Sequence, residues 1–321
     1  MYWRSSYIIV ALALTLFACK GKESESPVAE TPVEAIEGYF NPHALAEPSE
    51  LLAIAETPHI KVVDFREQDA YEKGHIPGSI RLWRTDIEDA AQPVPGMIAP
   101  RDKMETLFSN LGINSTDTLI LYDDLGGVNA ARLWWVLQVY GFDKVRLLNG
   151  GLQAWENLNV PSSQEDAAYP PSTFRFEGDG ASELRIENDR LQSLLGETGW
   201  ALVDARTTDE FSGKRMKKGA KAAGRIPGSI HIDWADAVRY NGDRTFRPAG
   251  ELKKIYNQLP DDRDSPIVIY CHSGVRSAHT TFVLTQLLGY RQVQNYDGSW
   301  LEWSSLEGVP IEKDSTTSIL K

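Results

Sequence analysis

The chain has 321 residues, of which 42% are hydrophobic and 24% charged, and its formal net charge is −12. At roughly 150 residues per domain this length predicts about two domains, and the composition is that of a globular protein with a sizeable core. The acidic charge argues against a nucleic-acid partner, because proteins that bind nucleic acid present a basic face.

The first residues have the pattern of an export signal. Arg4 supplies a positive start, residues 7–17 are mostly apolar, and Leu16-Phe17-Ala18-Cys19 ends the stretch as a cleavage site with the small residue Ala18 before a cysteine. The stretch is shorter than the about 20 apolar residues of a membrane-spanning helix. It resembles a bacterial lipoprotein signal, which implies that residues 1–18 are removed and that Cys19 carries a lipid. An ordinary signal peptide, or a buried helix with an incidental cysteine, is the alternative.

Residues 19–40 are rich in Glu, Pro and Ser and predict a tether. The lipoprotein resemblance implies a protein of the bacterial cell envelope that meets the membrane only through its N-terminal lipid. Lys20, rather than Asp, follows Cys19, which favours the periplasmic face of the outer membrane.

An internal repeat with a period near 150 residues organises the rest of the chain. In the first half, Val62-Val63-Asp64-Phe65-Arg66 precedes Gly74-His75-Ile76-Pro77-Gly78-Ser79-Ile80. In the second half, Val203-Asp204-Ala205-Arg206 precedes Gly224-Arg225-Ile226-Pro227-Gly228-Ser229-Ile230. The ends also match, since Asn149-Gly150-Gly151 with Trp155 corresponds to Asp297-Gly298-Ser299 with Trp303. The repeat predicts a duplicated domain.

Within each copy, short β-rich runs alternate with helical patterns, which predicts an α/β fold with a parallel sheet flanked by helices on both faces. In the first copy we expect strands near 61–64, 118–122 and 144–147, and helices near 102–111 and 128–140. In the second copy we expect strands near 201–204, 267–270 and 292–295, and helices near 249–258 and 278–288. The predicted domains are 41–164 and 183–313, joined by a linker at 165–182 that contains Pro170-Pro171.

One cysteine is placed for chemistry. Cys271 follows the apolar run 267–270 and precedes a loop that contains Gly274. A strand that delivers a thiol to a loop before a helix aims N–H groups and the helix dipole at the sulfur, which favours the thiolate. The cysteines of exported proteins usually form disulfides. If Cys19 carries a lipid, Cys271 has no cysteine to pair with, which favours a catalytic role. The first copy has Asp123 in its place, so we expect that half to be catalytically silent.

Together these features resemble the tandem-domain rhodanese family of sulfurtransferases. The resemblance runs from about Leu45 to Pro310 and rests on the duplicated Ile-Pro-Gly-Ser-Ile segments after Asp-x-Arg, the Asp123 replacement and the loop at Cys271. It implies two rhodanese-like α/β domains. It also implies that Cys271 takes a sulfane sulfur from thiosulfate as a persulfide and passes it to cyanide or a thiol, without a metal or another cofactor. Arg206 would bind the anionic donor. The backbone amides of the loop would surround the outer sulfur: His272, Ser273, Gly274, Val275 and Arg276.

Several alternatives remain at this stage. Ser273, two places after the cysteine, is typical of 3-mercaptopyruvate users, whereas the cations of the segment after Arg206 favour thiosulfate. Arg276 either adds positive charge for the donor or locks the loop through a carboxylate. Cys-dependent phosphatases place five residues between cysteine and arginine, but here four intervene, which makes a smaller loop. A lipid-anchored binding module without turnover is the non-enzymatic alternative. The cations after Arg206 that favour thiosulfate are Lys214, Arg215, Lys217 and Lys218.

Overall fold

The computed structural model describes residues 38–314. The expected signal peptide, Cys19 and most of the predicted tether therefore lie outside the described residues. Between residues 38 and 314, none of the helices is long and apolar enough to cross a membrane.

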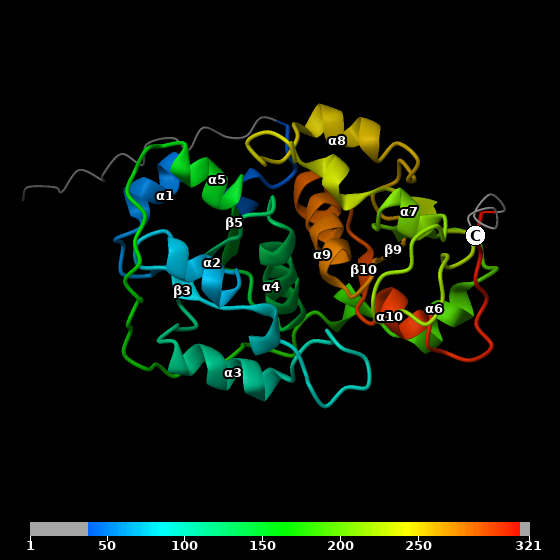
Figure 1. Ribbon diagram of the computed structural model, residues 1–321, viewed down its shortest axis with the longest axis horizontal. Coiled ribbons are helices and arrows are strands. Elements are labelled where there is room, and N and C mark those ends of the chain that lie inside the picture. The colour runs from blue at the N-terminus through cyan, green and yellow to red at the C-terminus, as the bar shows by residue number, and fades with distance from the viewer. Residues whose placement is uncertain (1–37, 315–321) are drawn as a thin grey trace, which may run out of the picture. The chain divides into compact units, whose positions relative to one another are not determined.

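Each half of the chain forms a five-stranded parallel sheet (Figure 1). In the first half the strands are β1 (Leu45–Ala46), β2 (Ile60–Asp64), β3 (Ile80–Arg81), β4 (Thr118–Tyr122) and β5 (Val145–Leu148), in the order β1-β5-β4-β2-β3. In the second half they are β6 (Arg185–Ile186), β7 (Ala201–Asp204), β8 (Ile230–His231), β9 (Ile267–Tyr270) and β10 (Val293–Tyr296), in the order β6-β10-β9-β7-β8. The same order in both halves confirms the predicted parallel α/β fold.

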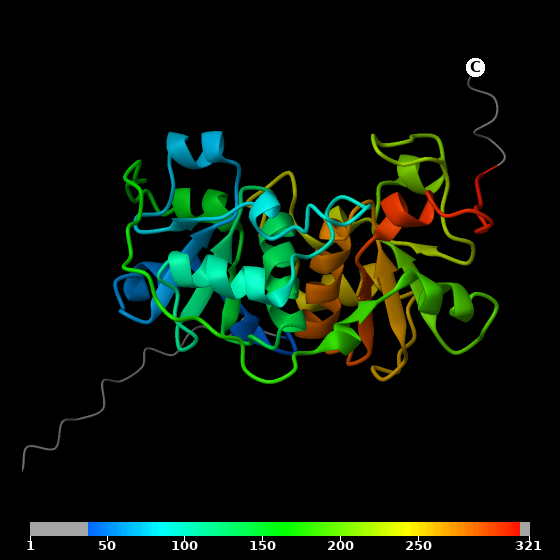
Figure 2. The ribbon, with the colours of Figure 1, turned by 90° about the horizontal axis from the view of Figure 1, so that it is seen from below.

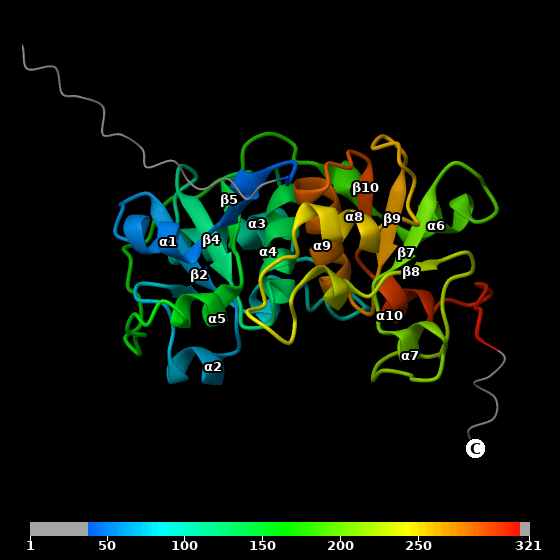
Figure 3. The ribbon, with the colours of Figure 1, turned by 90° about the horizontal axis from the view of Figure 1, so that it is seen from above.

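Helices flank each sheet on both faces (Figures 2 and 3). In the first half they are α1 (Pro48–Ile54), α2 (Gln68–Lys73), α3 (Arg101–Asn110), α4 (Val128–Val139) and α5 (Gly151–Glu156). In the second half they are α6 (Asn188–Leu194), α7 (Thr208–Phe211), α8 (Ala249–Ile255), α9 (Val275–Phe282) and α10 (Ser299–Trp303). A π-helical turn, Val283–Leu287, continues α9. No helix or strand interrupts residues 157–181, which include most of the predicted linker.

Alternation along the strands divides the apolar side chains between two cores in each half. In β9, Ile267 and Ile269 join a cluster with α4, α8 and α9, whereas Val268 and Tyr270 join a cluster with α6 and α10. Successive side chains of a strand point to opposite faces, so the sheet is covered on both sides. The period of two thus places the residue after Tyr270 on the α9 side of the sheet.

The two halves meet along α4 and α9, which lie side by side (Figures 1 and 3). Every residue of α4 except Gln138 is buried, as expected of a helix enclosed on all sides. The rings of Trp134 and Phe282 pack edge to face across this boundary, with centroids 5.0 Å apart. One hydrophobic core therefore runs through both halves and places the start of α9 against the first half.

The duplicated motif builds a buried polar cluster at the same place in each half. In the second half the Tyr270 hydroxyl donates to Asp204 Oδ2 at 2.8 Å, and the Ile226 amide donates to the Tyr270 hydroxyl at 3.1 Å. Arg206 closes the cluster by donating from Nη2 to Asp204 Oδ2 at 2.5 Å and to the Gly224 carbonyl at 2.8 Å. The first half repeats the same contacts with Asp64, Arg66, Gly74, Ile76 and Tyr122.

Candidate active site

Cys271 lies between the end of β9 and the start of α9. It is the free cysteine of the described residues, and only 1% of its surface is exposed. Gly274 caps α9 in the left-handed region, with φ 75° and ψ −4°, which turns the chain sharply from strand to helix. The Ser277 hydroxyl, in the first turn of α9, donates to Cys271 Sγ at 3.4 Å. The sulfur therefore sits at a helix N-terminus, where N–H groups and the helix dipole favour negative charge.

The pKa of Cys271 lies below its ordinary value. Burial raises this pKa. The charge of Arg276, the Ser277 hydroxyl and the backbone amides of Ser277 and Ser273 together lower it by more than burial raises it. A thiolate is the nucleophilic form of cysteine. The site thus holds the thiol in its reactive form at a pH below that at which a free cysteine ionises.

Arg276 is fixed by a carboxylate while it acts on the sulfur. Its Nη1 and Nη2 donate to Glu210 Oε2 and Oε1, in α7, at 2.7 and 2.9 Å. The side chains of Arg276 and Glu210 are 13% and 4% exposed. Although burial raises the pKa of Glu210, Arg276 and Thr207 bring it down to about 2. The guanidinium is therefore held in place by the carboxylate, which is the second of the two roles expected for it.

The first half shows what the same loop does with a carboxylate. Asp123, directly after β4, is fully buried and accepts four backbone N–H bonds of 2.7 to 2.9 Å, from Leu125, Gly127, Asn129 and Ala130. Burial raises the pKa of Asp123, and the four amides counter that rise. The strand-to-helix loop is thus a cradle for an anion, filled in the first half by its own side chain. In the second half the shorter side chain of Cys271 stands at the corresponding position, before α9.

Ser299 holds the loop together, a role that its place in the repeated segment Asp297-Gly298-Ser299 did not predict. Its hydroxyl accepts the amides of Cys271 and Gly274 at 3.1 and 3.0 Å and donates to the Tyr296 carbonyl at 2.7 Å. Ser299 adopts φ 50°, a strained value for a residue with a side chain. The amide of Gly274 therefore faces Ser299, which corrects the expectation that it surrounds the outer sulfur.

The other predicted loop residues divide between site and scaffold. Ser273 is half-buried, and its amide faces Cys271. His272 is buried, with Nε2 3.1 Å from the Lys218 carbonyl; since a carbonyl only accepts, Nε2 carries the proton and the buried Nδ1 has no partner within residues 38–314. Burial and the charge of Lys217 lower the pKa of His272 to about 4, so its ring is neutral at neutral pH. The side chain of Val275 packs into the shared core.

Arg206 has a different place from the one expected. Its guanidinium is enclosed by Asp204, the Gly224 carbonyl and the rings of Tyr270 and Trp300, with 1% of the residue exposed. Arg66 makes the matching contacts in the half that lacks the thiol. The structure therefore gives Arg206 a scaffold role, in place of the predicted direct contact with the donor.

Replacing Arg206 or Arg66 with methionine should lower the free energy of unfolding by about 3–5 kcal/mol in each case, because either change leaves a buried carboxylate unpaired. Urea unfolding of the two variants measures this directly. If Arg206 bound the donor instead, Arg206→Met alone would raise KM for the donor while leaving the unfolding free energy close to that of the parent.

The first half reaches into the second at the catalytic loop. Arg132, in α4, is 1% exposed; its Nη2 donates to Asp297 Oδ1 at 2.6 Å and to the Gly96 carbonyl at 2.7 Å, and its Nη1 donates to the Gly274 carbonyl at 3.3 Å. Asp297 Oδ2 in turn accepts the amide of Ile98 at 3.1 Å. A Cβ at Gly274 would lie 2.8 Å from Arg132 Nη1, so only glycine fits. The half without a thiol therefore positions the loop of the half that has one.

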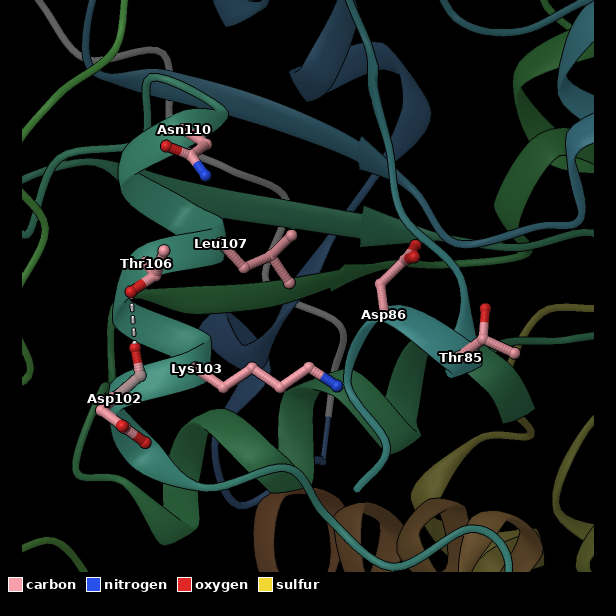
Figure 4. A pocket seen from close by; sticks show the side chains of 7 residues that line it. All are labelled: Thr85, Asp86, Asp102, Lys103, Thr106, Leu107 and Asn110. Carbon is pink, nitrogen blue, oxygen red and sulfur yellow. Dashed lines mark hydrogen bonds between the residues drawn. The ribbon is translucent and has the colours of Figure 1, made fainter. Parts of the chain in front are cut away.

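A separate hollow of about 440 Å³ lies between η2 (Arg84–Asp86) and α3 in the first half (Figure 4). It is lined by Thr85, Asp86, Asp102, Lys103, Thr106, Leu107 and Asn110. None of these residues belongs to the loop at Cys271, so this hollow is not part of the candidate site.

Comparison with known proteins agrees with this arrangement. The model of the rhodanese-like domain matches residues 47–158 and 187–306. The sulfur carrier protein TtuD of Thermus thermophilus is 37% identical over 286 residues, which cover 86% of this chain and 99% of that protein. The thiosulfate sulfurtransferase of Corynebacterium glutamicum is 37% identical over 295 residues, 89% of this chain and 96% of that protein. The Tum1 protein of Saccharomyces cerevisiae has the same fold, with a TM-score of 0.73, 22% identity and coverage of 84% and 97%.

Proposed function

Because this chain belongs to the rhodanese-like domain family, of which it carries two copies, we propose that it is a sulfurtransferase that moves a sulfane sulfur from thiosulfate to cyanide or a thiol through a persulfide on Cys271. The carrying observation is the anion cradle around one buried thiol with a lowered pKa. Asp123, which fills the equivalent cradle with a carboxylate in the first half, supports that interpretation.

The reaction would take two displacements. The Cys271 thiolate attacks the outer sulfur of thiosulfate, the S–S bond breaks, and sulfite leaves with the electron pair. Cyanide or an acceptor thiolate then attacks the outer sulfur of the persulfide, the new S–S bond breaks, and the Cys271 thiolate is restored as thiocyanate or a new persulfide departs. Amides that converge on the outer sulfur stabilise its charge throughout. A covalent intermediate of this kind gives ping-pong kinetics.

Burial of Cys271 limits the donors that fit. With 1% of the residue exposed, only the narrow sulfur end of a donor reaches Sγ. Thiosulfate presents such an end on a compact dianion, which cations near the loop attract. The Arg276 guanidinium is not free to bind a phosphate, because both of its terminal nitrogens donate to Glu210. This supports sulfur transfer over the phosphatase alternative.

Parallel steady-state assays with thiosulfate and 3-mercaptopyruvate test the proposal. We expect cyanide-dependent thiocyanate formation that is faster with thiosulfate than with 3-mercaptopyruvate. The double-reciprocal plots should give parallel lines, as ping-pong kinetics require. Cys271→Ser should abolish turnover while its unfolding curve matches that of the parent. Faster turnover of 3-mercaptopyruvate would reassign the donor. Turnover that survives Cys271→Ser, or hydrolysis of an aryl phosphate, would reject the proposal.

We further propose that the protein works at the cell envelope, anchored by a lipid on Cys19. The support is the sequence of residues 1–19 alone. Fractionation of cells expressing the full chain should recover it in the membrane fraction, and Cys19→Ala should release it. Recovery of both forms in the soluble fraction would contradict the anchor.

A further inference from the structure

The scaffold role of Arg206 leaves open which groups receive the charge of an anionic donor. Thiosulfate is a dianion and its target is a thiolate, so the two repel each other unless cations lie where the far end of the donor rests. Arg276 stabilises the thiolate, but its guanidinium is already bound bidentately by Glu210. Another cation near Cys271 is therefore needed at the mouth of the site.

Lys217 is the first such cation. It lies in the exposed basic segment after α7, whose Lys218 carbonyl holds His272. The pKa of Lys217 is lowered: partial burial and the charges of Arg276 and Arg84 lower it, and the charges of Glu210 and Cys271 oppose them in part. The ammonium and the thiol therefore interact electrostatically. Neighbouring Lys214 pairs with Asp209 at 3.5 Å. Within residues 38–314 no carboxylate lies within 4.0 Å of Lys217 Nζ, so no ion pair neutralises it.

Arg84 is the second, and it comes from the first half. Its Nη2 lies 3.5 Å from Ser273 Oγ, in the catalytic loop, and its side chain is 29% exposed. Arg84 opens the covering loop, residues 84–98, which reaches toward the second half (Figure 2). Within this loop a Cβ on Gly96 would lie 3.5 Å from Ser273 and 3.7 Å from Arg84 Nη2, so the two segments are in close contact. Glu88 Oε1 lies 3.1 Å from both Nε and Nη2 of Arg84 and fixes the direction of the guanidinium, but, unlike the pair of Arg276 and Glu210, only one carboxylate oxygen is engaged.

We propose that Arg84 and Lys217 form an anion subsite that binds the charged end of the sulfur donor, the sulfonate end of thiosulfate, while its outer sulfur meets Cys271. The inference rests on the proposed function and extends it. The three cations near the loop, Arg84, Lys217 and Arg276, face two fixed carboxylates, Glu88 and Glu210. The half without a thiol therefore contributes a specificity-determining residue, Arg84, as well as Arg132, which holds the catalytic loop in place.

Two measurements on Arg84→Gln, Lys217→Gln and the double variant test the subsite. The first is the ratio of Cys271 alkylation rates by iodoacetate, an anion, and iodoacetamide, its neutral counterpart. Taking the ratio at one pH cancels changes in the thiol pKa. We expect the ratio to fall about threefold in each single variant and about tenfold in the double variant, because one unit charge is removed at each step. Arg81→Gln and Arg247→Gln, which remove cations that hydrogen-bond to neither Ser273 nor Cys271, should leave the ratio unchanged.

The second measurement compares thiosulfate with methanethiosulfonate, a donor of single negative charge. In the double variant, KM for thiosulfate should rise about tenfold with kcat nearly constant, and KM for methanethiosulfonate should rise less. An alkylation ratio and a KM for thiosulfate that both match the parent in the double variant would overturn the subsite. The alkylation ratio does not depend on turnover, so a fall in the ratio in a protein that transfers no sulfur would uphold the anion site and reject the proposed function alone.

Discussion

Replacing Arg276 with methionine should slow sulfur transfer at neutral pH by about a hundredfold, because the pKa of Cys271 rises without the guanidinium and less of the thiol is ionised. Burial alone raises that pKa, and Arg276 is the first of the groups that bring it down. The thiolate exists above the folded-state pKa and is lost as the pH falls through it. The variant should therefore lose activity over a higher pH range than the parent and recover part of it in alkali. The pH dependence of Cys271 alkylation measures the shift.

Glu210 provides the control for this prediction. Arg276→Met alone leaves the buried Glu210 carboxylate unpaired, which destabilises the fold as well as changing the thiol. In Arg276→Met with Glu210→Gln the unpaired charge is gone, so stability should return while the alkylation profile stays at high pH. A double variant that regains both stability and the parent profile would show that Arg276 acts only through the fold.

Replacing Arg132 with methionine should lower the free energy of unfolding by about 3–5 kcal/mol, because Asp297 is then a buried charge without its partner. The same change should lower kcat per folded molecule, since the Gly274 carbonyl loses its donor from the first half and the loop loses its latch. Urea unfolding and turnover, both measured on the full chain, separate the two effects.

Arg146→Met is the matched control for Arg132. Arg146 pairs with Glu50 inside the first half, with Nη1 2.5 Å from Oε1, and touches no residue of the catalytic loop. Its loss should cost stability without changing kcat per folded molecule. Parent-like turnover in folded Arg132→Met would mean that the first half does not position the site.

The long elements could be predicted from the sequence because their patterns span several residues. β4 and β9 have the predicted bounds, and α4 ends within one residue of its predicted end. The edge strands β1, β3, β6 and β8 have two residues each, too few to show a period. Two of them begin with the last isoleucine of the duplicated motif, so that motif carried a strand that alternation alone does not reveal.

The candidate site could be predicted only where its residues lie close together in the sequence. Cys271 and its loop follow from strand, glycine and helix in order. Arg132 and Arg84 could not be found, because they reach the loop only after the two halves pack together. The repeat did hold a signal for Arg206: an arginine present in both copies, including the copy without a thiol, serves what the copies share, which is the fold.

The measurement that bears most directly on the central claim is the mass of the intact protein after treatment with thiosulfate and removal of the excess. The account predicts a gain of about 32 Da, one sulfur atom, located on the peptide that contains Cys271, lost on addition of cyanide and never seen in Cys271→Ser. An unchanged mass in folded protein, or a gain that persists in Cys271→Ser, would contradict it.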